Sequence, residues 1–122
     1  MIDARVAAYD AAWNAPDQEA RSRLLEESLT SDAELIDPDH GPVRGRTAIN
    51  ERIAGFSDRF PGARVSITSD VDEHNGFARY GWTITDREDN SVLEGIDIVE
   101  RAEDGRIKRV IMFFGPLPAA DH

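Results

Sequence analysis

The chain of 122 residues is long enough for one domain with a single hydrophobic core, and its formal net charge of −10 opposes binding to nucleic-acid phosphates. It contains no cysteine, which excludes disulfides and thiolate metal ligands and is typical of a reducing cytosol. No apolar run approaches the length of a membrane span, and the acidic Asp3 does not fit a secretory signal, so we expect a cytoplasmic protein.

The first part of the chain has the spacing of amphipathic helices. In residues 3–14, Val6, Tyr9 and Trp13 are about one turn apart and predict an apolar stripe that faces a core. After a proline break, residues 17–29 carry leucines at the same spacing. We therefore expect two helices, over residues 3–14 and 17–29.

A short strand and a third helix are predicted next. Residues 33–37 read as a strand that is ended by a proline and followed by a loop. Thr47 is a suitable N-cap for a helix that runs to about Phe60, where the following Pro-Gly step stops it. The apolar face of this helix consists of Ile49, Ile53, Phe56 and Phe60.

The second half of the chain predicts a meander of antiparallel strands. The predicted strands cover residues 63–73, 77–86, 92–101 and 106–114. Each gap between them holds turn residues, of which Asn75-Gly76 is the strongest hairpin signal. Three helices followed by such a meander predict an α+β fold, in which a curved antiparallel sheet wraps around three N-terminal helices.

The turns allow the strand register to be estimated. The first hairpin, centred on its Asn-Gly step, pairs Val71 with Tyr80, and the second pairs Trp82 with Asp97. Cross-strand partners share a face and side chains alternate along a strand, so all four belong to one inner face. This face also collects Val65, Ile67, Ile84, Leu93, Val99, Val110, Met112 and Phe114. Asp97 is the one charged group in the middle of this apolar set.

The opposite face of the predicted sheet is mixed. Its apolar centre consists of Ile96, Ile98, Ile111 and Phe113. Arg79 lies on this face, between Asp72 and Glu100, and can form a cross-strand ion pair there. Alternatively, a bulge would turn Arg79 inward, where it would pair with Asp97. The apolar outer face favours a homodimer formed through the sheet.

The order of these elements resembles the nuclear transport factor 2-like superfamily, and most closely its SnoaL-like and ketosteroid-isomerase-like branches. The resemblance covers about residues 5–115. It is carried by the short motifs IDP at 36–38, GR at 45–46, HNG at 74–76, IDIV at 96–99 and DGRI at 104–107. It implies a single SnoaL-like domain over residues 1–122, with the shape of a cone-shaped, cystatin-like roll. The open end of such a cone holds a small apolar pocket.

The resemblance also implies three catalytic residues. By position in the pattern, Tyr9, Asp37 and Asp97 match those of the ketosteroid isomerases. In that branch, the aspartate of the Asp-Pro step moves a proton next to a carbonyl group. The tyrosine and a second, protonated aspartate donate hydrogen bonds to the enolate oxygen.

The chemistry of the two aspartates agrees with these roles. Burial among apolar side chains raises the pKa of a carboxyl group by as much as about 3–5 units, so we expect Asp97 to be neutral at pH 7. Asp37, at a strand end before a loop, is expected to be wetter and nearer its ordinary pKa. Each also has a structural interpretation. Asp97 can be satisfied by a buried water or the Tyr9 hydroxyl, and Asp37 can cap the turn before the proline.

We therefore expect acid–base proton transfer on a small apolar carbonyl compound, either isomerase-like or polyketide-cyclase-like. The alternative is a non-catalytic module for small-ligand binding or dimerisation. An epoxide hydrolase is less favoured, because Gly81 stands two residues after Arg79 where that branch has an aspartate. The sequence leaves the substrate open, and also whether the protein is catalytic.

The residues expected to contact the ligand are Trp13, His40, Phe56, Phe60, Tyr80, Trp82, Val99, Val110, Met112 and Phe114. If the bulky members of this set filled the pocket, no ligand would fit and the enzyme hypothesis would fail. No cofactor is expected. No metal site is expected either, because the histidines at 40, 74 and 122 are scattered along the chain.

Overall fold

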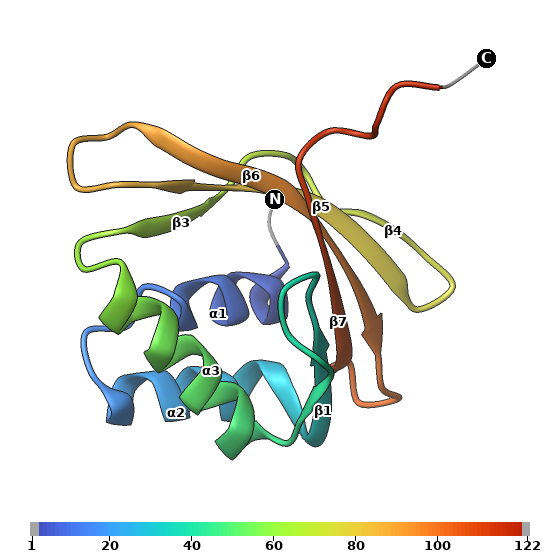
Figure 1. Ribbon diagram of the computed structural model, residues 1–122. Coiled ribbons are helices and arrows are strands. Elements are labelled where there is room, and N and C mark those ends of the chain that lie inside the picture. Colours follow the sequence, from blue (N-terminus) through green and yellow to red (C-terminus); the bar gives the residue numbers. More distant parts are fainter. Residues whose placement is uncertain (1–2, 121–122) are drawn as a thin grey trace.

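The computed structural model describes residues 3–120, which form three helices and seven strands (Figure 1). The helices are α1 (Ala4–Ala12), α2 (Gln18–Ser28) and α3 (Arg46–Arg59). The strands are β1 (Leu29–Ile36), β2 (Val43–Arg44), β3 (Arg64–Ile67), β4 (Asp72–His74), β5 (Phe77–Thr85), β6 (Ser91–Arg101) and β7 (Ile107–Phe114). Figure 1 shows the helices grouped on one side of a curved sheet. Among the described residues, no helix is both long and apolar enough to cross a membrane.

The strands form one sheet in the order β2-β1-β7-β6-β5-β3, and β4 also pairs with β5. The predicted α+β fold is confirmed, but the sheet is mixed, because β1 runs parallel to β7 while the other pairs are antiparallel. The parallel pair places Glu34 beside Arg109, 75 residues further along the chain. A pattern of local hairpins does not reveal a pairing over that distance.

The three predicted helices are present, with changes at their ends. Asp3 and Asp17 cap α1 and α2, and their carboxylates accept hydrogen bonds from backbone amides of the first turn. The predicted cap of the third helix is wrong: α3 begins after Gly45, and Thr47 lies inside it. Gly45 has a φ of 91°, which a threonine rarely adopts, and its N–H donates to the carbonyl of Ala33 at 2.8 Å. The chain therefore enters the helix directly from β2.

The predicted strand over residues 63–73 is divided into β3 and β4. Between them, the N–H of Thr68 donates to the carbonyl of Gly81, and the hydroxyl of Ser69 accepts from the N–H of Gly81. As a result, β4 keeps the predicted register, whereas β3 is shifted by two residues. Ile67 pairs with Trp82, although the register that pairs Val71 with Tyr80 predicts Ile84 as its partner.

The predicted pairing of Trp82 with Asp97 is also wrong by two residues. Asp97 lies opposite Tyr80 for two reasons. Asp86 closes a longer turn by accepting hydrogen bonds from the N–H groups of residues 88 and 90, and the pairing of the strands then shifts by one residue between Ile84 and Thr85. A shift of two residues does not change which side of the sheet a side chain faces. The predicted inner face is therefore confirmed despite the wrong register.

The outer face carries the exposed apolar residues that the pattern predicts. Ile96 and Phe113 are 43% and 55% exposed. Arg79 points outward on this face and pairs with Asp72 at 2.8 Å, so the alternative in which a bulge turns it toward Asp97 is wrong.

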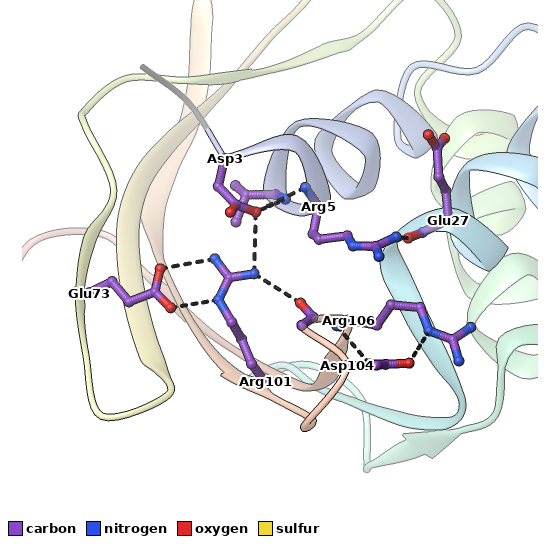
Figure 2. A network of polar contacts seen from close by, with 9 residues as sticks. Asp3, Arg5, Glu27, Glu73, Arg101, Asp104 and Arg106 are labelled. Carbon is purple, nitrogen blue, oxygen red and sulfur yellow. Dashed lines mark hydrogen bonds and ion pairs between the residues drawn. The ribbon is translucent and has the colours of Figure 1, made fainter.

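A polar network fixes the start of α1 to the sheet (Figure 2). The side chain of Arg101, only 10% exposed, donates to both carboxylate oxygens of Glu73 at 2.7 and 3.1 Å. It also donates to the carboxylate of Asp3 and to the carbonyl of Gly105, at 3.2 and 3.1 Å. One guanidinium group thus connects the cap of α1, β4 and the turn between β6 and β7. This holds α1, which carries Tyr9, over the inner face of the sheet.

Candidate functional site

A cavity of about 800 Å³ lies between the inner face of the sheet, α1 and α3. The predicted residues that line it are Tyr9, Trp13, His40, Phe56, Phe60, Tyr80, Trp82, Asp97, Met112 and Phe114. The bulky side chains surround this space without filling it. Its volume lies within the range of small-molecule sites.

Aromatic rings form much of the cavity wall. Trp13 meets Tyr9 and Phe56 edge to face, with ring centroids 6.4 and 5.5 Å apart. On the sheet, the Trp82 indole lies against Gly95 in the neighbouring strand. A Cβ on Gly95 would come within 2.4 Å of the indole and 2.1 Å of a backbone carbonyl. Only glycine therefore leaves room for the indole in this position.

Asp97 lies in the middle of β6 and is 5% exposed. The Tyr80 hydroxyl donates to Oδ2 at 3.0 Å, whereas Oδ1 has no hydrogen-bond partner among residues 3–120. Burial raises the pKa of Asp97 to about 7. The Tyr80 hydrogen bond opposes the rise, and so does the Trp82 N–H, which lies near the carboxyl group without forming a hydrogen bond of normal geometry. Near pH 7 this carboxyl group is therefore divided between its protonated and ionised forms, whereas we expected a neutral group. The hydroxyl that reaches it is that of Tyr80 and not that of Tyr9.

Two further polar atoms in the cavity wall lack a partner. The Tyr9 hydroxyl and the Trp82 Nε1 are buried, and neither makes a hydrogen bond within the described part of the chain. Burial, together with the nearby charge of Asp97, raises the pKa of Tyr9 well above its usual value, so it remains a donor. A buried polar group without a partner costs about 1–3 kcal/mol. These atoms are candidates for contact with a bound molecule.

The expectation that Asp37 is wet is wrong. Its side chain is 1% exposed, and it does not line the cavity. Oδ1 accepts hydrogen bonds from the backbone N–H groups of Asp39 and His40, both at 2.9 Å, and Oδ2 pairs with Arg52 at 3.1 Å. Burial would raise the pKa of Asp37, but these hydrogen bonds and the charge of Arg52 together lower it. This is the geometry of a turn-capping residue.

His40 connects Asp37 to the cavity. Its Nδ1 lies 3.1 Å from Oδ1 of Asp37, and the ring lines the cavity. Arg52, which also lines the cavity, lies over the Trp13 ring, 5.9 Å from its centroid. Asp37 therefore orients two cavity residues without reaching the cavity itself.

Two other predicted ligand contacts do not reach the cavity. Val99 and Val110 pair with each other on the inner face of the sheet, but both belong to the closed hydrophobic core. They lie two residues along their strands from Asp97 and Met112, where the packed side chains of the core cover the sheet. The pattern identified their face correctly and could not show where the cavity ends.

Charged residues of the cavity were missed by the sequence interpretation. They include Asp10, Arg52, Arg59 and Arg87. Burial raises the pKa of Asp10 to about 6. Arg52 and Arg59 share the helical face of Phe56, at spacings of four and three residues, so the helical period could have identified them. The Arg87 side chain comes from a turn, for which the sequence held no comparable signal.

Within residues 3–120, no three histidine, aspartate or glutamate side chains lie close enough together to hold a metal ion. His122 lies outside the described residues. The polar groups of the cavity are suited to hydrogen bonding and proton transfer with an organic molecule.

Three helices against a curved sheet, with an aromatic cavity between them, define the nuclear transport factor 2-like, or ketosteroid-isomerase-like, fold. The model of the SnoaL-like domain matches residues 6–110, and the chain belongs to this SnoaL-like family. No curated protein sequence matches the chain significantly.

Solved structures agree with this assignment. A SnoaL-like family protein from Agrobacterium tumefaciens, whose name suggests an isomerase, is 28% identical with a TM-score of 0.86, over 92% of this chain and 95% of that one. A Sinorhizobium meliloti protein, whose name suggests a polyketide cyclase, is 18% identical (TM-score 0.72; 92% and 95% covered). A protein with a ketosteroid isomerase-like fold from Catenulispora acidiphila, in complex with trimethylamine, is 14% identical (TM-score 0.75; 93% and 86% covered).

Proposed function

We propose that this protein binds a small apolar carbonyl compound in the cavity and catalyses proton transfer on it. The reaction would be an isomerisation or a polyketide-cyclase-like ring closure. The observation that carries the proposal is that Tyr9, Trp82 and Asp97 each place a buried polar atom in a cavity wall rich in aromatic side chains, and that these atoms have no partner among the described residues. The names of two similar proteins, an isomerase and a polyketide cyclase, support the same reaction class.

The donors act on the carbonyl oxygen of the ligand. Tyr9, Trp82 and protonated Asp97 each offer a hydrogen to an acceptor in the cavity. When a proton leaves the carbon next to the carbonyl, negative charge develops on that oxygen. Hydrogen bonds from donors in a site of low dielectric strengthen as this charge grows, which lowers the barrier.

The proton acceptor in this proposal is His40. Asp37 holds Nδ1 of the ring, which leaves Nε2 to remove a proton from the ligand. The C–H electron pair then moves into the enolate, and the protonated imidazole returns the proton to another carbon. Asp37 takes part by orienting the ring and stabilising its positive charge.

The role of His40 can be tested with nitrobenzisoxazole, a general substrate for general-base catalysis by proteins. A base removes its carbon-bound proton, a nitrile forms, the N–O bond breaks and the oxygen leaves as a phenolate. We expect His40→Gln to lower the rate of ring opening by about 100-fold or more, because general-base catalysis is lost. The measurement is phenolate absorbance against time.

His74→Gln is the matched control, because His74 is exposed on the β4–β5 hairpin and does not line the cavity. Its rate should equal that of the unmodified protein. An unchanged rate in His40→Gln would reject His40 as the base. If the unmodified protein were no faster than free imidazole at equal concentration, the enzyme proposal would be contradicted.

A non-catalytic ligand-binding module is the second candidate. It is favoured by the fixed hydrogen bonds of Asp37, which leave the carboxylate of the Asp-Pro step no direct access to a ligand. In this case, the cavity would bind the probe without opening its ring.

We also propose that the chain forms a homodimer through the apolar outer face of the sheet. This face contains Ile96, Ile98, Ile111 and Phe113. Beside them, Glu34, Arg109 and Glu100 form cross-strand ion pairs at 2.9–3.1 Å. We propose, in addition, a cytoplasmic location, which the absence of cysteine supports. We also propose a single domain over residues 1–122, which the family match over residues 6–110 supports.

A further inference from the structure

Two arginines line the cavity at the end formed by the β5–β6 turn. Arg59 comes from the last turn of α3, and Arg87 from the turn itself. Arg52, the other arginine of the lining, is paired with Asp37. Within the described residues, Arg59 and Arg87 make no ion pair with a carboxylate. Their positive charges are therefore available at this end of the cavity.

Local structure holds both side chains at the rim. The guanidinium of Arg59 lies over the Phe60 ring, 5.5 Å from its centroid. Arg87 packs on the turn that follows, and its Nη2 donates to the carbonyl of Pro61 at 3.3 Å. A Cβ on Gly62 would lie 3.0 Å from the Cβ of Arg87, so the glycine allows this close packing. Together, the contacts place Arg59 over the exposed Phe60 ring and Arg87 against the turn that follows this ring.

The lining also contains the carboxylates of Asp10, Asp39, Glu51 and Asp86. The one next to Arg87 in the chain, Asp86, is held by hydrogen bonds within its own turn. Asp86 accepts hydrogen bonds from the N–H groups of Glu88 and Asn90 at 2.9 and 3.0 Å. The backbone hydrogen bonds within the turn lower the pKa of Asp86, so it stays ionised as part of the turn. Its oxygens therefore serve the backbone and do not pair with Arg59 or Arg87.

The cavity thus has two unlike polar regions joined by an apolar wall. Asp97 and Tyr9 are buried among the helices and the sheet, whereas Arg59 and Arg87 are exposed at the rim. A molecule that satisfies both regions carries a neutral acceptor at one end and a negative charge at the other.

We infer that the ligand is amphipathic, with an apolar body and an anionic group of the carboxylate type that Arg59 and Arg87 bind at the rim. The placement of its carbonyl end beside Asp97 rests on the proposed function. The anionic end rests on the rim geometry alone. The two arginines would then determine specificity for charged over neutral ligands of the same shape.

Two fluorescent probes that differ by one anionic group test this inference. Anilinonaphthalene sulfonate carries a sulfonate on the same aromatic body as neutral phenylnaphthylamine. Both tryptophans of the chain, Trp13 and Trp82, line the cavity, so energy transfer from tryptophan reports binding of a probe to the protein, and the effect of the arginine variant below assigns the sulfonate to the rim. We expect the sulfonate to bind more tightly than the neutral probe. Added salt should weaken the binding of the sulfonate and leave the binding of the neutral probe unchanged.

The variant Arg59→Gln/Arg87→Gln should raise the dissociation constant of the sulfonate about three- to tenfold, as for two exposed charge pairs. It should leave the neutral probe unchanged, which also shows that the cavity remains folded. Arg23→Gln/Arg64→Gln is the control, because it removes the same charge from exposed positions outside the cavity. Its affinities for both probes should match those of the unmodified protein.

The possible outcomes separate this inference from the proposed function. Suppose that the neutral probe binds with energy transfer but the sulfonate binds no more tightly. The inference of an anionic ligand group is then rejected, whereas the proposed apolar ligand site is supported. Equal losses of sulfonate affinity in Arg59→Gln/Arg87→Gln and in the control Arg23→Gln/Arg64→Gln would also reject the anionic group of the ligand. If neither probe shows energy transfer, both the inference and the apolar ligand site are contradicted.

Discussion

The carboxyl group of Asp97 is kept partly neutral by its surroundings. It lies among Tyr80, Trp82 and Met112 on the inner face of the sheet, and within residues 3–120 it accepts one hydrogen bond, from the Tyr80 hydroxyl. Its pKa of about 7 makes both protonation states accessible near neutral pH. This property suits a group that donates a hydrogen to a developing oxyanion.

The raised pKa also makes stability depend on pH. Because the folded protein holds this proton more tightly than the unfolded chain, the free energy of unfolding should fall as pH rises from about 4 to about 7. A rise of the pKa from its ordinary value of 3.8 to about 7 corresponds to a loss of about 4 kcal/mol in the free energy of unfolding above pH 7. Asp97→Asn, which cannot ionise, should therefore stabilise the protein at pH 8 and have little effect at pH 4. Urea denaturation at the two pH values measures this.

Asp70→Asn, in an exposed segment before β4, is the control and should show no such difference. Carboxyl NMR gives an independent measurement, with an expected midpoint near pH 7 for Asp97. A midpoint near pH 4 would contradict the role of this group as a hydrogen donor.

At the scale of elements, the position of α1 decides the shape of the cavity. Helix α1 carries Tyr9 and Asp10. The network around Arg101 connects the cap of this helix, Asp3, to β4 and to the end of β6 (Figure 2). The contacts of α1 with α2 and with β3 hold the rest of the helix. Loss of the Arg101 network should therefore loosen the start of α1 first.

Arg101→Met should lower the free energy of unfolding by about 1–3 kcal/mol, since several hydrogen bonds to charged groups are lost at a mostly buried site. Arg106→Met is the matched control, because Arg106 pairs with Asp104 only two residues away in an exposed turn. We expect that control to change stability by less than about 1 kcal/mol. The free energy of unfolding is measured by urea denaturation. Similar decreases in both variants would show that the Arg101 network stabilises the protein no more than a single local ion pair does.

At the scale of the whole molecule, the sheet has one face covered by helices and one face that the monomer leaves uncovered. The uncovered face presents Ile96 and Phe113 beside the ion pairs of Arg109. An apolar centre flanked by charges is typical of a protein interface.

Phe113→Glu should convert the proposed dimer to a monomer, because it places a charge at the centre of the apolar face. Light scattering after gel filtration measures the mass. Leu117→Glu, in the exposed segment after β7, adds the same charge outside this face and should leave the dimer intact. A monomeric mass for the unmodified chain would contradict the proposed interface.

The local pattern of the sequence determined the helices, most strands, the inner face of the sheet and the placement of Asp97 in it. These features depend on helical and strand periodicity, which acts between neighbours in the chain. The errors of register did not matter for the faces, because each was a shift of two residues. Only the tertiary structure decided the parallel pairing of β1 with β7, the burial of Asp37, and the arrival of Arg59 and Arg87 at one rim. Each of these depends on contacts between distant segments, for which a single sequence carries no periodic signal.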